Sequence, residues 1–208
     1  MRIRRVEVTP GFLLLAALLY YLDRDNVLLW SALACALHEL GHWAMIRLCG
    51  GEVALLRLSA SGAELRLSAR HRLGHGAHCL CALAGPGVNL ALAFLAPAAG
   101  AAWGEGWYLF SGVNLSLAAF NLLPVRQLDG GRALWHLAAG LWGERCGTRV
   151  VRWSSAVTLA VLTAAGAVQF WLTGYNFTLL LTTLWLIYSL TGLFHRSAGP
   201  AGRKKEFL

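Results

Sequence analysis

Apolar blocks as long as membrane spans, separated by short basic connections, decide what kind of protein this chain can form. A bilayer core roughly 30 Å thick takes about 20 helical residues to cross. Of the 208 residues, 57% are hydrophobic and only 13% are charged, too few charges to cover a water-soluble globule of this size. The sequence therefore predicts an integral membrane protein. The span-length blocks are Val27–Ile46, Gly76–Trp103, Trp107–Leu123, Trp153–Leu172 and Phe177–Phe194.

A shorter apolar block, Gly11–Leu22, follows a basic N-terminus and so looks like a signal peptide. No small-residue cleavage pattern comes after it, because the chain continues Tyr20-Tyr21-Leu22-Asp23-Arg24. We therefore expect an uncleaved first span. The predicted fold class is an all-α polytopic membrane protein with about six transmembrane helices.

The positions of the basic residues predict the orientation of these spans. With the N-terminus inside, all but one of the 18 Lys and Arg residues face the cytoplasm, and only Arg24 lies outside. We expect a multi-pass cell-membrane protein with both termini cytoplasmic, residues 1–196 as a single domain and residues 197–208 as a short basic tail. Since the basic residues lie between apolar blocks, the net charge of +8 indicates contact with the lipid bilayer and no nucleic acid partner.

Two segments between the predicted spans have patterns of their own. Glu52–Ser68 alternates apolar and polar residues on both sides of Ser61-Gly62, which predicts a β-hairpin, an insert at about 51–70, on the cytoplasmic face. The short segment Val6–Val8 can add to the same sheet. Ala133–Gly143 is apolar but too short to cross a bilayer, so we expect a helix that returns along the bundle.

Two acidic residues, Glu39 and Asp129, fall at membrane depth, where a charge is expensive and so marks a functional site. Glu39 lies in His38-Glu39-Leu40-Gly41-His42. Residues four apart share a helix face, so His38 and His42 can offer two imidazole nitrogens to one metal ion. Zinc suits two such nitrogens and one carboxylate, and Glu39 can take a proton from water at the open position. The alternative is a pair of packed histidines on a buried helix.

Asp129 lies in a segment whose composition breaks a helix. Pro124 ends the preceding helix, and Gly130 and Gly131 permit turn conformations closed to other residues. Such a break at membrane depth is tolerated only where it faces protein or a wet cavity. The segment therefore aims a carboxylate inward, as a third zinc ligand. The alternative is an ordinary Asp–Gly turn in a cytoplasmic loop.

Three motifs together resemble the signatures of the site-2 proteases, which are intramembrane zinc metalloproteases. They are His38-Glu39-Leu40-Gly41-His42, Gly85-Pro86-Gly87-Val88-Asn89, and Asn121-x-x-Pro124-x-x-x-x-Asp129-Gly130, in this order over about residues 6–135. The resemblance implies one Zn²⁺ per chain, bound by His38, His42 and Asp129, with Glu39 as the general base. It also implies a membrane-protein substrate, cleaved near the cytoplasmic leaflet, and regulatory membrane proteins as partners.

Within that family the third motif is most similar to the sporulation branch, which processes a pro-sigma factor. That branch typically carries a CBS domain after its last span, whereas this chain has only the short basic tail there. The pro-sigma factor expected from the branch is therefore one possible substrate, beside an anti-sigma factor and a signal-peptide remnant.

Two asparagines extend the predicted site. We expect Asn121 to be catalytic, as an amide donor that stabilises negative charge on the substrate carbonyl. Asn89 is polar and lies mid-span, so it either contacts substrate in the same cavity or joins helices by hydrogen bonds.

A second cluster of candidate metal ligands lies at the start of the block Gly76–Trp103, and it is more simply explained as incidental because it lacks a closed four-ligand spacing. Its members are His75, His78, Cys79 and Cys81. Two other functions stay open, a catalytically inactive metal-binding scaffold and a metal transporter. A transporter usually shows an inverted repeat of hydropathy, which this sequence lacks.

Overall fold

In the computed structural model the described residues form two compact units, one that ends at Leu122 and one that begins at Leu123. It describes residues 6–8, 10, 17, 21, 23, 27–59, 62–67 and 73–197. The predicted first span, Gly11–Leu22, and the predicted tail, 197–208, lie almost entirely outside the described residues. Each unit is described separately below.

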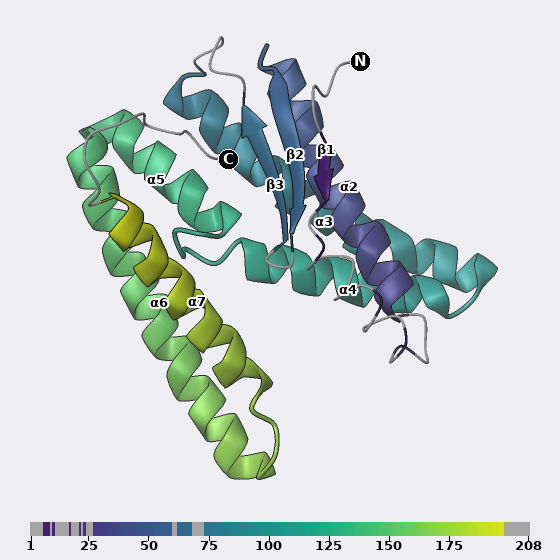
Figure 1. Ribbon diagram of the computed structural model, residues 1–208. Coiled ribbons are helices and arrows are strands. Elements are labelled where there is room, and N and C mark those ends of the chain that lie inside the picture. The colour runs from purple at the N-terminus through teal and green to yellow at the C-terminus, as the bar shows by residue number, and fades with distance from the viewer. Residues whose placement is uncertain are drawn as a thin grey trace. The chain divides into compact units, whose positions relative to one another are not determined.

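Three helices form most of the first unit: α2 (Val27–Leu48), α3 (His75–Trp103) and α4 (Gly106–Asn121) (Figure 1). All three pack against one another. A Cβ on Gly41 of α2 would lie 2.8 Å from Val88 Cγ2 and 2.9 Å from the carbonyl oxygen of Ala84, both on α3, so the two helices pack closely at this glycine. The predicted spans at Val27–Ile46, Gly76–Trp103 and Trp107–Leu123 correspond to these helices.

Helix α2 has two faces of different character. Its buried face carries two histidines among small or apolar residues, and its other face exposes leucines such as Leu29, Leu33 and Leu40. A helix that is apolar on its exposed face suits a lipid environment better than water. The histidines are therefore held on the protein side of the helix. The buried residues are Ala34, His38, Gly41, His42 and Ile46.

Aromatic packing joins the N-terminal parts of α2 and α4. The Trp30 ring lies 5.6 Å from that of Trp107 and 5.3 Å from that of Phe110, centroid to centroid. Gly106 leaves room for this contact, since a Cβ there would approach Trp30 to 2.9 Å. Ala34 and Ala96 complete the buried cluster, so α2, α3 and α4 share one core.

A three-stranded sheet belongs to the same unit, in the order β1 (Val6–Val8), β2 (Val53–Ser59), β3 (Gly62–Leu67). β1 pairs with β2 in parallel, and β2 pairs with β3 antiparallel, with an irregularity of register near the start of β2. β2 and β3 fall in the segment for which the sequence predicts a hairpin; the connecting residues 60–61 lie outside the described part of the chain. In the described sheet, β3 is an edge strand.

The second unit contains α5 (Asp129–Trp142), α6 (Glu144–Thr173) and α7 (Thr178–Ser197) (Figure 1). α6 packs against both α5 and α7. α5 covers the segment predicted as a short returning helix. α6 begins nine residues before the predicted span at Trp153, because Glu144 favours a helix N-terminus and the arginines that follow can extend away from the helix.

Within the described residues, two helices are long and apolar enough to cross a bilayer, His75–Gly100 and Glu144–Thr173, and a shorter apolar helix runs over Thr178–Leu190. α6 and α7 also expose large apolar side chains that water would not favour. These features fit a membrane protein. The six spans and their orientation stay predictions.

Candidate metal centre

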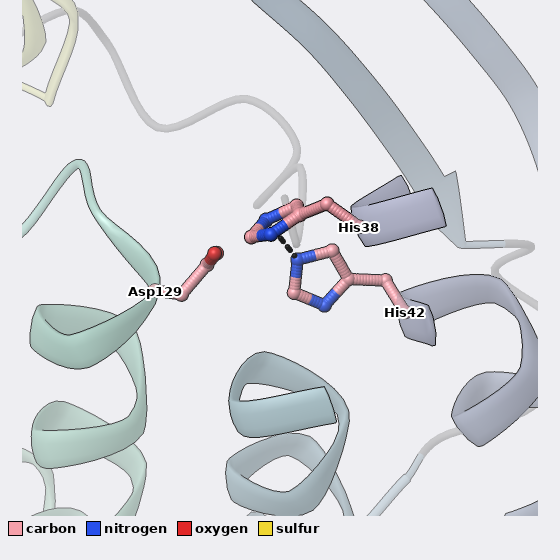
Figure 2. A group of neighbouring side chains, drawn as sticks. All are labelled: His38, His42 and Asp129. Carbon is pink, nitrogen blue, oxygen red and sulfur yellow. Dashed lines mark hydrogen bonds between the residues drawn. The ribbon is translucent and has the colours of Figure 1, made fainter. Parts of the chain in front are cut away.

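The two motif histidines lie on neighbouring turns of α2 and point the same way (Figure 2). Both are buried, with exposed fractions of 6% for His38 and 8% for His42. Their Nε2 atoms are 3.1 Å apart, and the two rings meet edge to face. The spacing of four residues thus brings both imidazoles to one place, as the sequence predicts.

The hydrogen bond at Nδ1 of His42 determines which ring nitrogen carries the proton in the neutral imidazole. His42 Nδ1 lies 2.7 Å from the backbone carbonyl oxygen of Cys81 on α3. A carbonyl oxygen can only accept, so in the neutral ring Nδ1 carries the proton and Nε2 carries a lone pair. The ring is therefore oriented with a metal-binding atom toward His38.

His38 is fixed in the same way by a side chain. Its Nδ1 contacts Asn89 Oδ1, and the Asn89 amide nitrogen donates to the carbonyl oxygen of Ala34, at 3.3 Å, and to Asn114 Oδ1, at 2.7 Å. Since Asn89 presents its oxygen to the ring, His38 also donates from Nδ1 and keeps a lone pair on Nε2.

The result is an arrangement that a cation would stabilise. Both Nδ1 atoms are engaged elsewhere, and the two facing Nε2 atoms, 3.1 Å apart and joined by the dashed line in Figure 2, are the atoms that one shared metal ion would bind. Neutral imidazoles whose second nitrogen is hydrogen bonded are typical zinc ligands. The residues present therefore fit zinc.

Gly85 provides the space beside these ligand atoms. A Cβ on Gly85 would lie 2.4 Å from Nε2 of His42 and 2.8 Å from Nε2 of His38. Only a glycine lets the α3 backbone pass this close to the imidazoles. Gly85 thus lets α3 pack directly against the two imidazole rings.

Asp129 is the first residue of α5, in the second unit (Figure 2). Its side chain is buried, and one carboxylate oxygen lies 3.7 Å from the Arg132 guanidinium. An acidic side chain in the first turn interacts favourably with the helix dipole. Among the described residues, His38, His42 and Asp129 are the candidate metal ligands, each buried and each offering one ligand atom.

The broken segment before Asp129 is held by the helices of its own unit. The Pro124 carbonyl oxygen accepts from Ser154 Oγ at 2.9 Å, and the Arg126 backbone N–H donates to Ser155 Oγ at 3.1 Å. Gln127 Nε2 donates to the Leu186 carbonyl oxygen on α7 at 3.1 Å. These bonds satisfy polar groups that the helix break leaves exposed, as a break at membrane depth requires.

The two glycines after Asp129 act differently from the expectation. Neither Gly130 nor Gly131 has a positive φ, so the prediction of special turn conformations there is wrong. Both lie inside α5. A Cβ on Gly131 would lie only 2.0 Å from the Val125 carbonyl oxygen, so this glycine is needed for space.

The remaining predicted residues lie as follows. Glu39 is partly exposed on α2, next to His38. Asn121 is the last residue of α4, and its amide nitrogen donates to the Leu117 carbonyl oxygen of the same helix at 3.0 Å. In the described part of the chain, the second cluster at His75–Cys81 does not gather three ligand atoms that could hold a metal ion.

Two residues that help to orient the histidines were not predicted: Cys81, which contacts His42, and Asn114, which acts through Asn89. Cys81 acts through its backbone carbonyl, for which a sequence carries no signal. Asn114 was overlooked, although it is a polar side chain in the middle of an apolar block, which is the same signal that marks Asn89.

Comparisons with known proteins point to one family. Residues 96–165 match the family model "Peptidase family M50". In an alignment 161 residues long that covers 68% of this chain, the sequence is 34% identical to the zinc metalloprotease candidate Rip3 of Mycobacterium tuberculosis, in the Erdman and H37Rv strains. The chain spans 40% of the length of these relatives.

The fold is similar to that of the site-2 protease from Methanocaldococcus jannaschii. The TM-score is 0.67 at 18% identity, and the match covers 100% of this chain and 98% of that one. At this identity the likeness concerns the fold. The family model and the curated relatives are each similar to part of this chain, and the names that they carry are those of a peptidase family and of a zinc metalloprotease candidate.

Proposed function

We propose that this protein is an intramembrane zinc metalloendopeptidase that cleaves a transmembrane or membrane-associated protein near the cytoplasmic leaflet. The observation that carries the proposal is the pair of Nε2 atoms on His38 and His42, each left with a lone pair by the hydrogen bond at its Nδ1. Asp129 is the third ligand in this proposal. Its position in the family motif and its donor chemistry support that role.

Zinc held by His38, His42 and Asp129 would supply a Lewis acid, which makes water at the site more acidic. Glu39 adjoins the first ligand and is partly exposed, so it can reach water, accept its proton and return a proton to the leaving amine. Asn121 donates an amide hydrogen bond to the negative charge that develops on the carbonyl oxygen. Neither role requires these residues to bind the metal.

The substrate must expose its peptide bond before it can be cleaved. A transmembrane helix uses its backbone groups in its own hydrogen bonds, so the segment to be cut has to unwind. Strand β3, an edge of the described sheet, offers backbone groups to such an extended segment by β-addition. Regulated proteolysis of a pro-sigma or anti-sigma factor is the process that fits this reaction.

Replacement of Glu39 by Gln tests the catalytic proposal. Because Glu39 is proposed to move protons and not to bind zinc, Glu39→Gln should keep the zinc content of the purified full chain and lose cleavage by about 10²- to 10⁴-fold. Elemental analysis measures the zinc, and processing of a co-expressed membrane substrate measures cleavage.

The control and the rival functions use the same assays. Asp129→Ala should lose both zinc and cleavage. A Glu39→Gln variant with unchanged activity would indicate a metal-binding scaffold or a transporter, and wild-type protein without zinc would exclude the proposed metal site.

A further inference from the structure

Three helices of the first unit are joined by one chain of side-chain hydrogen bonds. On α4, Asn114 Nδ2 donates to the Phe110 carbonyl oxygen at 2.8 Å. Asn114 Oδ1 accepts from Asn89 Nδ2 on α3 at 2.7 Å, and Asn89 Oδ1 contacts Nδ1 of His38 on α2. Both asparagines are fully buried, with 0% of their surface exposed.

The donor and acceptor of each hydrogen bond in this series are fixed by the backbone carbonyl oxygens that it reaches. The Phe110 carbonyl oxygen can only accept, so Asn114 must turn its nitrogen toward it and its oxygen toward Asn89. Asn89 must then present its nitrogen to that oxygen, and the Ala34 carbonyl oxygen at 3.3 Å demands the same orientation. The oxygen of Asn89 is thereby left for the His38 ring.

We propose that Asn89 and Asn114 are positioning residues that hold His38 as the Nδ1-protonated tautomer, with its Nε2 lone pair ready for the metal. The inference rests on the proposed function for the identity of that metal. Without these hydrogen bonds, His38 could carry its proton on Nε2 or its ring could turn, and either change would remove a ligand atom. Hydrogen-bond partners of zinc ligands typically change metal affinity by about 10- to 100-fold.

The sequence leaves two roles open for Asn89, a substrate contact and hydrogen bonds that join helices, and the role proposed here extends the second. The oxygen and the nitrogen of Asn89 are both engaged by α2 and α4, and no part of the side chain is exposed. Asn114 acts on His38 only through Asn89, because its side chain is hydrogen bonded to Asn89 and the described bonds join it to neither imidazole.

Zinc affinity of the purified full chain, measured by competition with a chelator, tests the proposal independently of proteolysis. Asn89→Ala should lower the affinity by about 10- to 100-fold, and Asn114→Ala should lower it by a smaller factor in the same direction. Ser111→Ala is the matched control, because Ser111 Oγ also joins α4 to α3, by a 2.6 Å bond to the Ala93 carbonyl oxygen. Equal losses in Ser111→Ala and Asn114→Ala would overturn the proposal.

A double-mutant comparison separates orientation from packing. In Asn89→Asp both oxygens of the carboxylate are acceptors, so either one can accept from His38 Nδ1 and no hydrogen bond from Asn114 is needed to orient the side chain. Adding Asn114→Ala to Asn89→Asp should therefore cost no zinc affinity. If Asn114→Ala lowers the affinity equally in both backgrounds, Asn114 only packs the helices and the proposal fails.

The wild-type protein provides a readout that does not depend on variants folding. Nitrogen NMR of histidine-labelled, zinc-free protein should show His38 protonated on Nδ1 and not on Nε2; the opposite tautomer would overturn the inference. Wild-type protein that has this tautomer but does not bind zinc would instead contradict the proposed function.

Discussion

At the level of single residues, the pattern His38-Glu39-x-x-His42 predicts the facing imidazoles because helix geometry alone brings residues four apart together. What fixes each ring could not be predicted in full. The His42 partner is the backbone carbonyl of Cys81, and its position depends on how α3 passes α2. Asn89 was recognised as a buried polar residue, but its direction follows from Asn114 and from two carbonyl oxygens.

Gly85 gives a prediction at this scale. Gly85→Ala should lower zinc affinity by at least about tenfold, because the added Cβ would lie 2.4 Å from His42 Nε2 and displace a ligand ring. Gly87→Ala is the matched control two residues along the same helix, since nothing lies within 4 Å of its Cβ. Chelator competition measures both variants. Full zinc affinity in Gly85→Ala would show that the rings are not held where the structure has them.

At the level of secondary-structure elements, hydropathy predicts the long helices well and their ends less well. Predicted span boundaries for α2 and α3 differ from the structure by one or two residues, because apolar blocks and helices end together there. α6 starts nine residues early, since a charged segment can be helical without being apolar. The close approach at Gly131 could not be foreseen, because it depends on the path of residues 124–128.

Strand β3 gives a prediction at the scale of an element. If substrate pairs with this edge, Ala63→Pro near the predicted tip should abolish cleavage, because proline lacks the N–H and disrupts strand pairing. Zinc content should stay normal. Ala63→Ser keeps the N–H and serves as the control. Cleavage of a co-expressed substrate at the wild-type rate by Ala63→Pro would exclude β-addition at this strand.

At the level of the whole molecule, composition predicts a membrane protein, and the exposed apolar side chains of α6 and α7 agree with it. The fold matches that of a solved site-2 protease over the full chain at low identity. Sequence patterning cannot supply the arrangement of helices, because many pairings bury the same residues. The structure adds which helix faces meet within each unit.

Topology is the prediction that belongs to this scale. A fluorescent protein fused after Leu208 should fluoresce, and an alkaline phosphatase fused there should be inactive, because the basic connections keep the C-terminus in the cytoplasm. The same phosphatase fused after Asp25 should be active. An active phosphatase at the C-terminus would contradict the predicted orientation.

The hydrogen bonds that set both imidazoles end on main-chain oxygens, at positions 34, 81 and 110. Every amino acid supplies that oxygen. A saturation screen would thus score these three positions only by what fits in the core, and would never identify them as parts of the zinc site. The backbone paths of α2, α3 and α4 therefore decide which nitrogen of each imidazole carries the proton, and substitution of the side chains at these three positions leaves the carbonyl oxygens in place.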